Sequence, residues 1–276
     1  PFDVDRFPAA KVKRAAADLG LTINMGFGMP LEYNIISPDA SVRKVGLDFS
    51  YKLIDLCNEA GARLFGGMIY CGWGYLTGKA RTADEWKWAV DSYREIASYT
   101  QRASDLSLAI EPVNRFESHF INTAADAVKF IHAVGMPNVR VHLDTFHMIR
   151  EEDDFVQAVE TVGGLLGYVH ACENQRGIPG SGMVPWVPFF QALRKVGYDG
   201  CVIDVDDATL AEACGARALF REDGVAIVDE EHPALEDLRD IDSLTLPDPY
   251  RSGRLPEWLE TTKRIMDAIG DHVFVM

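Results

Sequence analysis

The feature that most constrains the fold is a regular alternation of short β-branched apolar runs with longer segments of helical periodicity. Strand starts recur about every 30 to 40 residues, which is the size of one βαβ unit. The predicted strands are 21–27, 62–70, 106–113, 139–147, 165–173 and 201–206. The predicted helices between them are 38–60, 83–105, 122–134, 153–163 and 186–196. This alternation predicts an α/β fold of the (β/α)8 TIM-barrel type.

The strand series is shorter than a closed barrel needs, since it gives six strands where about eight are required. We therefore expect a barrel that is incomplete at its N-terminus. The rhythm changes after residue 206, where the sequence becomes acidic and is interrupted by prolines. One helix is predicted there at about 256–269, before a final apolar run, HVFVM, that is able to cap an open strand edge. The predicted domains are 1–200, barrel-like, and 201–276, a foreign α/β segment.

Composition excludes several classes of function. The 276 residues carry a formal net charge of −15, which argues against a nucleic-acid partner, because phosphate backbones are bound by clustered Lys and Arg. No apolar stretch is long enough to predict a membrane span. The five cysteines form no C-x-x-C pair, which is typical of a protein in the reducing cytoplasm.

Three successive strands end in a polar residue that the preceding apolar run does not need: Glu111, Asp144 and His170. The carboxyl ends of parallel barrel strands face one mouth, where active sites are found. Two carboxylates and one imidazole suit Mn²⁺, Co²⁺ or Mg²⁺ better than a metal that prefers thiolates. We therefore predict a metal site formed by these three residues. The alternative is a set of helix-capping or salt-bridged side chains that bind no metal.

Further polar residues follow each of these positions: Glu117, His147 and Arg176. We predict that they bind substrate, because Arg offers a fork of donors for oxygen atoms and His donates or accepts near neutral pH. Taken singly, residues such as Glu117 and Arg176 are more often plain surface charges. His142 shares a strand face with Asp144, so we expect an interior hydrogen-bonding role for it. The histidines expected at the surface or at helix caps are His119, His132 and His232.

Several segments resemble one family, the D-tagatose and D-psicose 3-epimerases within the xylose isomerase-like barrels. They are IEPVNRFESHFINTAADAVKFI, VHLDTFHMIREED, GYVHACENQRGIPGSGMVPW and ALRKVGYDG. The resemblance covers about 200 residues and implies a metal-dependent ketose 3-epimerase acting on D-fructose and D-psicose or on D-tagatose and D-sorbose. It implies three metal ligands at Glu111, Asp144 and His170, with Mn²⁺ favoured, and a catalytic role for Glu111. Glu117, His147 and Arg176 would contact the sugar.

The sequence departs from this family at its fourth metal ligand, which is also its second proton-transfer acid. The resemblance places a Glu at position 205, where this chain has Val205, flanked by Asp204 and Asp206. Asp204 is the candidate replacement, although neighbouring strand residues point to opposite faces. The family's first strand and helix also have no counterpart before Pro1. We therefore expect weak or absent activity in this chain.

From about residue 197 to the C-terminus the sequence resembles part of the uroporphyrinogen decarboxylase and corrinoid methyltransferase superfamily. The segments that carry this resemblance are GYDGCVIDVDDATLAEACGARALFREDGVAIVDE, LEDLRDIDSLTLPDP and GRLPEWLETTKRIMDAIGDHVFVM. It predicts that the chain is either a chimera of two families or the product of a misassembled reading frame, with the junction near residues 197–206.

Three other interpretations remain open. The chain is compatible with another isomerase of the superfamily, such as a hydroxypyruvate isomerase or inosose dehydratase, and with a non-catalytic chimeric fragment. A DNA-repair endonuclease of the same barrel type would need extra His ligands and a basic face. The expected partners are a small-molecule ketose and further copies of the chain in a homo-oligomer.

Overall fold

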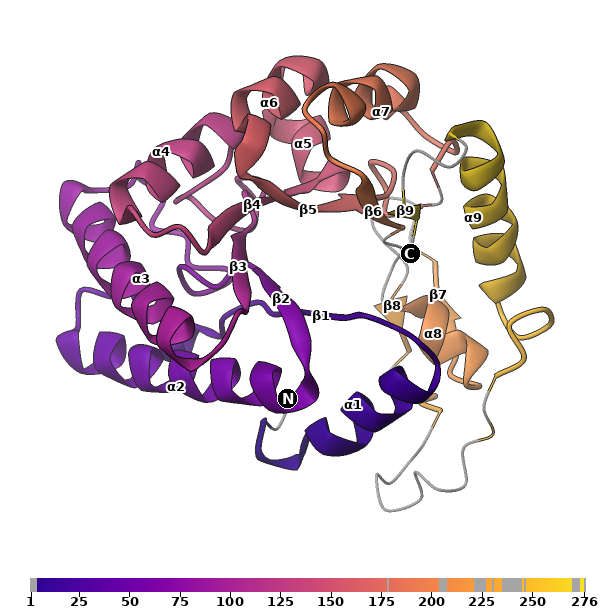
Figure 1. The fold of residues 1–276 in the computed structure, drawn as a ribbon, viewed down its shortest axis with the longest axis horizontal. Helices are drawn as coiled ribbons and strands as arrows, with labels where there is room; N and C mark the ends of the chain where they lie inside the picture. The colour runs from indigo at the N-terminus through magenta and orange to yellow at the C-terminus, as the bar shows by residue number, and fades with distance from the viewer. Residues whose placement is uncertain are drawn as a thin grey trace. The chain divides into compact units, whose positions relative to one another are not determined.

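The computed structural model describes residues 4–177, 179–203, 208–220, 227–229, 231–234, 245, 247–269 and 274–275. The chain divides into two compact units, Pro1–Tyr168 and Val169–Met276. Figure 1 follows both units along the chain. Asp204, Val205 and Asp206, on which the prediction of a fourth metal ligand depends, lie outside the described residues.

The first unit alternates strands with helices, as predicted. Its strands are β1 Ile23–Gly26, β2 Ala62–Gly67, β3 Ser107–Ile110 and β4 Val139–Asp144. Its helices are α1 Ala9–Asp18, α2 Ala40–Ala60, α3 Ala83–Ala103, α4 Ala124–Val134, α5 Thr145–Glu151 and α6 Phe155–Val162. Short 3₁₀ turns are η1 Val4–Arg6, η2 Leu31–Tyr33 and η3 Gly163–Leu165. The strand β5 Leu166–Ala171 begins in this unit and ends in the second.

The strands of the first unit pair in parallel and in chain order, β1-β2-β3-β4. The register places Leu64 opposite Ser107 and Leu108 opposite Val139. Helices α2, α3 and α4 lie along one side of these strands (Figure 1). Parallel strands joined by crossover helices confirm the predicted α/β fold of the TIM-barrel type, because this connection places every strand's carboxyl end at the same edge.

The helix α3 begins with a capping box that matters for the site. The Thr82 hydroxyl accepts a hydrogen bond from the Glu85 backbone N–H at 3.1 Å, and the Glu85 carboxylate accepts one from the Thr82 backbone N–H at 2.7 Å. This reciprocal pair satisfies two donors that a helix start otherwise leaves without partners. Glu85 is buried as a result, and its second carboxylate oxygen is available to other groups.

Several predicted strands end earlier than expected, and the cause is clear for two of them. The strand predicted over 139–147 stops at Asp144, because its carboxylate caps α5 by accepting a hydrogen bond from the Phe146 backbone N–H at 2.7 Å. The prediction was therefore wrong for the segment Thr145, Phe146 and His147, which is helical. The strand predicted over 62–70 stops at Gly67, whose φ of 107° favours glycine.

A cluster of aromatic rings fills the core between α3, α4 and the loops that follow β2 and β3. Phe130 on α4 is fully buried, and its ring centroid lies 5.5 Å from that of Tyr93, 5.5 Å from that of Trp86 and 6.2 Å from that of Tyr70. Phe120 packs edge-on against the same ring. Because Tyr70 follows β2 directly, this cluster supports the loops that carry the polar residues described below.

The second unit contains α7 Trp186–Lys195, β6 Gly200–Ile203, α8 Ala208–Ala213, β7 Ala218–Leu219, β8 Ile227–Val228, α9 Leu255–Ile269 and β9 Phe274–Val275. β5 and β6 pair in parallel, and β9 pairs in parallel with β6. Phe274 and Val275, from the final apolar run, therefore pair with one edge of β6, in agreement with the edge-capping role expected for that run. The predicted helix at 256–269 is α9, whereas the antiparallel pair β7-β8 was not predicted.

No helix among the described residues is both long and apolar enough to cross a lipid bilayer.

Candidate metal and substrate site

Glu111 lies one residue beyond the end of β3 and is fixed through its backbone. Its N–H donates to the carbonyl oxygen of Gly67 at 3.2 Å, and the buried Tyr70 hydroxyl donates to its carbonyl oxygen at 2.8 Å. The side chain is 12% exposed. The backbone of Glu111 is thus held from β2 and its loop, which leaves the carboxylate to face its neighbours on β4 and α5.

Asp144 divides its two oxygens between two tasks. One oxygen caps α5, as described above, and the other lies 3.9 Å from the His147 Nε2 atom. The side chain is fully buried. A buried carboxylate is stable in its ionised form only when hydrogen-bond donors or cations surround it, so this second oxygen is a natural ligand for a positive charge.

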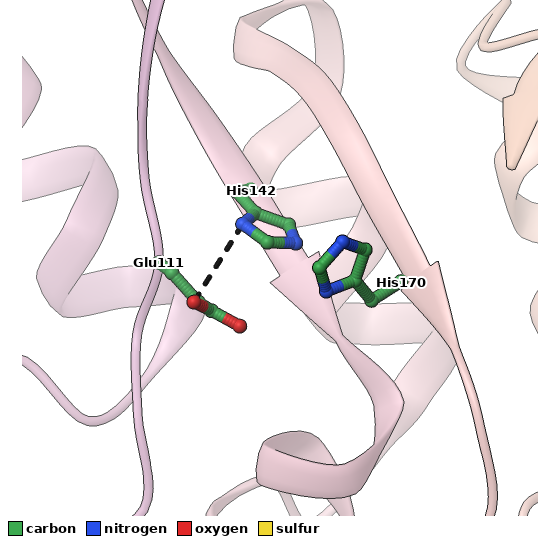
Figure 2. A group of neighbouring side chains, drawn as sticks. All are labelled: Glu111, His142 and His170. Carbon is green, nitrogen blue, oxygen red and sulfur yellow. Dashed lines mark ion pairs between the residues drawn. The ribbon is translucent and has the colours of Figure 1, made fainter. Parts of the chain in front are cut away.

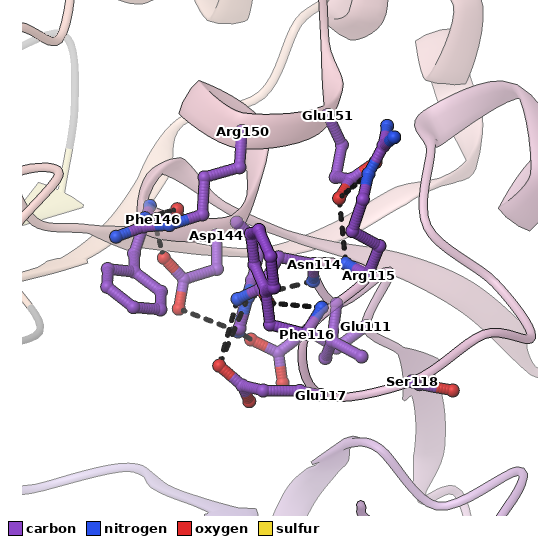
Figure 3. A network of polar contacts seen from close by, with 12 residues as sticks. Glu111, Asn114, Arg115, Phe116, Glu117, Ser118, Asp144, Phe146, Arg150 and Glu151 are labelled. Carbon is purple, nitrogen blue, oxygen red and sulfur yellow. Dashed lines mark hydrogen bonds and ion pairs between the residues drawn. The ribbon is translucent and has the colours of Figure 1, made fainter. Parts of the chain in front are cut away.

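His147 lies between the two carboxylates. Its Nε2 atom is 3.7 Å from a Glu111 carboxylate oxygen, and its Nδ1 atom faces the Asn114 backbone N–H at 3.1 Å. Figure 3 shows Asn114 close to Glu111 and Glu117. A backbone N–H can only donate, so Nδ1 accepts and the proton of the neutral ring is on Nε2. Although Glu111, Asp144 and His147 each offer a ligand atom within 4.8 Å of one another, this tautomer makes His147 a donor rather than a metal ligand.

His142 also approaches Glu111, from β4. Its Nδ1 atom lies 3.7 Å from the other Glu111 carboxylate oxygen, as Figure 2 shows. Its ring packs against Tyr168 at a centroid distance of 4.9 Å. The interior role predicted for His142 agrees with this burial, and the position beside Glu111 adds an imidazole to the candidate site that the sequence analysis did not include.

Glu117 joins the same group through two residues that the sequence analysis missed. One carboxylate oxygen accepts from the Asn114 side-chain amide at 2.9 Å, and the other accepts from the Trp73 indole N–H at 3.0 Å. The first oxygen lies 4.0 Å from His147 Nδ1. The structure therefore brings together Glu111, Asp144, Glu117 and His147, all predicted site residues of the first unit.

The other predicted site residues belong to the second unit. His170 lies on β5, opposite Val202 in the register with β6. Arg176 follows in a loop with a positive φ of 59°, and its backbone N–H donates to the Glu173 carbonyl at 2.9 Å. Its guanidinium lies 4.0 Å from the Cys172 sulfur. The ligand role of His170 and the substrate role of Arg176 remain predictions.

The loop that contains Arg176 is organised by the buried carboxylate of Glu173. This carboxylate accepts from the backbone N–H of Gly180 at 2.6 Å, that of Val184 at 3.0 Å and the indole N–H of Trp186 at 2.6 Å. Three donors directed at one ionised acceptor form a strong, geometrically specific cradle. Glu173 was not singled out from the sequence, where it is one acidic residue among many.

We expect Glu173→Gln to lower the free energy of unfolding by about 1–3 kcal/mol, because the amide turns one acceptor into a donor that faces buried N–H groups. Denaturant unfolding monitored by circular dichroism measures the change. The control is Glu260→Gln, which removes an exposed charge that pairs within α9 and should change stability by less than about 0.5 kcal/mol. Equal effects of the two substitutions would contradict the cradle.

The remaining histidines divide into two groups. His132 is exposed in the last turn of α4, and His232, whose side chain is 56% exposed, pairs with Asp229 at 2.9 Å. Both agree with the surface role expected for them. The expectation was wrong for His119, whose side chain is only 9% exposed and contacts Glu85, because a residue from a distant helix covers it.

Known protein families match both parts of the chain. Residues 1–208 match the xylose isomerase-like TIM barrels, and residues 189–276 match uroporphyrinogen decarboxylase. A D-psicose 3-epimerase of Agrobacterium fabrum is 38% identical over 197 residues, which cover 70% of this chain and 67% of that protein. A D-psicose 3-epimerase of Ruminiclostridium cellulolyticum is 37% identical over 194 residues, with 70% and 66% covered. The chain thus spans about two thirds of the length of these curated relatives.

Solved structures of sugar epimerases are also similar to this chain. The crystal structure of a D-psicose 3-epimerase from Clostridium cellulolyticum H10 with D-tagatose has a TM-score of 0.68 at 35% identity, covering 73% of this chain and 69% of that one. The structure of an L-ribulose 3-epimerase has a TM-score of 0.73 at 26% identity, covering 99% of this chain and 86% of that one.

Parallel strands with crossover helices, together with carboxylates and imidazoles at the strand ends, define a TIM-barrel-type protein with a candidate metal site. This chain belongs to the xylose isomerase-like TIM barrel family. Its curated relatives are named as ketose 3-epimerases, so its lineage is that of an isomerase. The predicted resemblance of the first 200 residues is confirmed. The match of residues 189–276 concerns the tail, and the joining of two families remains a prediction.

Proposed function

We propose that this chain derives from a metal-dependent ketose 3-epimerase and retains the part of the site that removes the proton at C3. The observation that carries the proposal is the group formed by Glu111 and Asp144, at the ends of the neighbouring parallel strands β3 and β4, with His147 from the first turn of α5. Its support from lineage is the identity of 37–38% to proteins named D-psicose 3-epimerase.

The donor chemistry of the site fits a divalent cation. We propose that Glu111, Asp144 and His170 would hold it, since two carboxylate oxygens and one imidazole nitrogen suit Mn²⁺ first, with Co²⁺ or Mg²⁺ as substitutes. Such a cation supplies electrostatic stabilisation for negative charge that develops on the ketose oxygens. His147 is left out of the ligand set because of its tautomer.

In the proposed reaction Glu111 acts as the base at C3. Its carboxylate takes the C3 proton, the C–H electron pair forms the C2=C3 double bond, and the electrons of the carbonyl bond move to O2 to give an enediolate. Return of a proton to C3 restores the ketose. General acid–base catalysis of this kind contributes about 10²- to 10⁴-fold to a rate. Glu117, His147 and Arg176 would bind the O1 and O2 end of the sugar.

Inversion needs a second acid on the opposite face of the planar enediolate. The position that would supply it by family resemblance is Val205, and an isopropyl group cannot transfer a proton. A chain with Glu111 alone would take the C3 proton and return one to the same face. We therefore expect exchange of the C3 proton with solvent to outpace epimerisation.

The experiment follows D-fructose in D₂O by proton NMR with the Mn²⁺-loaded chain. Loss of the C3 proton signal reports proton removal, and appearance of D-psicose reports inversion. We expect the first without a comparable amount of the second. Chelation of the metal should stop both, and addition of Mn²⁺ should restore exchange. D-tagatose in place of D-fructose tests the alternative ketose pair.

Two outcomes would change the proposal. Equal rates of exchange and epimerisation would mean that another residue serves as the second acid. A folded, Mn²⁺-bound chain that catalyses neither process on either ketose would overturn the proposed function. The same sample tested with hydroxypyruvate and with an inosose would then examine the remaining isomerase and dehydratase alternatives.

We also propose a reducing, cytoplasmic setting and assembly into a homo-oligomer. The first rests on free thiols, which the structure describes at Cys57, Cys71, Cys172 and Cys214. Size-exclusion chromatography with light scattering tests the second.

A further inference from the structure

His119 connects three segments of the first unit. Its Nδ1 atom lies 2.9 Å from the carbonyl oxygen of Tyr75, in the loop after β2, and its Nε2 atom lies 3.3 Å from a carboxylate oxygen of Glu85 on α3. His119 itself belongs to the loop after β3 that carries Asn114 and Glu117. The ring is largely buried, so water does not easily replace either partner.

Both partners of this ring are acceptors. The Tyr75 carbonyl has no hydrogen, and the Glu85 carboxylate already accepts from the Thr82 backbone N–H at 2.7 Å and from the Thr82 hydroxyl at 2.9 Å through its other oxygen. A neutral imidazole has one N–H and therefore satisfies only one acceptor. With Glu85 ionised, two hydrogen bonds form only when both ring nitrogens are protonated, and the positive charge then lies beside the carboxylate.

The other titratable groups near His119 and Glu85 do not form an alternative ion pair with either residue. Burial raises the pKa of the Cys71 thiol to about 12, and burial together with the Glu85 charge raises the pKa of Tyr75. Both groups are therefore neutral near pH 7. Arg81 is directed elsewhere, to the Phe120 carbonyl at 2.6 Å and to Asp126 at 2.7 Å.

The loop after β2, whose Tyr75 carbonyl contacts His119, also contacts Glu117. The Trp73 indole donates to the Glu117 carboxylate, and the Gly74 backbone N–H donates to the Glu117 carbonyl at 3.0 Å. Tyr75, the residue that accepts from His119, follows immediately. The two loops are thus joined at both ends of the segment from Glu117 to His119.

We propose that His119, as a doubly protonated imidazolium paired with Glu85, is a positioning residue that fixes Trp73 and Glu117 for ketose binding. This inference rests on the proposed function for its kinetic consequence only. His119 touches neither the reacting carbon nor the proposed metal ligands. Its loss should therefore weaken ketose binding without removing the C3 proton-transfer step.

Ring ¹⁵N spectra of the intact chain at about pH 7 test the protonation state directly. We expect two protonated ring nitrogens for His119. Spectra of His119→Gln assign the signals, and the exposed His132 provides a reference within the same molecule. A neutral His119 ring would overturn the proposal, whether or not the chain catalyses any reaction.

Two comparisons of His119→Gln with the matched control His132→Gln test positioning. Backbone amide hydrogen exchange over residues 72–76 should become at least about tenfold faster in the first variant only, since protection depends on local opening. The KM for D-fructose in the C3 exchange assay should rise about five- to tenfold, with kcat and Mn²⁺ affinity changed less than about twofold.

The experiments distinguish a failure of the positioning role from a failure of the proposed function. Unchanged amide exchange, or equal changes in both variants, would overturn the positioning role. Absence of C3 exchange in the parent chain would overturn the proposed function but leave the ring spectra and amide exchange valid. If His119→Gln does not fold, the more conservative His119→Asn assigns the ring signals, and the spectra of the parent then decide between a charged and a neutral ring.

Discussion

Replacing Glu111 by glutamine is expected to abolish both Mn²⁺ binding and exchange of the C3 proton. The substitution keeps the size of the side chain but removes the charge that attracts the cation and the base that accepts the proton. Loss of the base alone corresponds to about 10²- to 10⁴-fold in rate. Isothermal titration calorimetry with Mn²⁺ and the D₂O exchange assay measure the two effects on the same protein.

A second site variant and an exposed control variant complete the test of Mn²⁺ binding. Asp144→Asn should also abolish Mn²⁺ binding, whereas Glu59→Gln, which removes an exposed carboxylate on α2, should leave it unchanged. Micromolar binding by the parent that both site substitutions remove would establish the site. If Glu111→Gln bound Mn²⁺ as tightly as the parent, Glu111 would not be a metal ligand. If the folded parent bound no Mn²⁺, these residues would be remnants of an ancestral metal site that no longer functions.

The second large effect is on stability. Phe130→Ala should lower the free energy of unfolding by about 3–5 kcal/mol, because it leaves a cavity within the ring cluster of Tyr70, Trp86, Tyr93 and Phe120. The Phe130 ring is fully buried. Urea unfolding should give a lower midpoint with little change in slope.

Phe116→Ala is the matched control, since this phenylalanine is 73% exposed. Removing it should change the free energy of unfolding by less than about 0.5 kcal/mol. If Phe130→Ala cost no more than Phe116→Ala, the ring cluster would not be the stabilising core that its burial indicates. The Phe130 substitution should also weaken the support of Glu111, because Tyr70 contacts both.

The elements that depend on hydrophobic periodicity were predicted well from the sequence. The strands at 62–70 and 106–113 and the helices at 38–60 and 83–105 all correspond to observed elements. The helix α5 was missed because the segment after Asp144 is apolar and short enough to read as the end of a strand. A local hydrogen bond, from the Phe146 N–H to Asp144, decides that boundary, and periodicity does not detect such a bond.

Some residues of the candidate site could likewise be predicted from the sequence, and others could not. Glu111 and Asp144 were predicted because a polar residue that follows an apolar strand can be recognised from the amino-acid sequence alone. Trp73 and His119 were not, because their importance lies in contacts with Glu117 and Glu85, which are 44 and 34 residues away in the chain. An indole and an imidazole in loops carry no pattern that indicates such partners.

The contacts described among Glu111, Asn114, Glu117, Asp144 and His147 all fall within the first unit, which ends at Tyr168. The proposed acid–base half of the candidate site therefore lies in one contiguous block of sequence. Recombination downstream of this block would replace later segments without breaking any of these contacts. Under the proposed function, proton abstraction and stereochemical inversion depend on different segments of the chain, and we expect the first to survive the loss of the second.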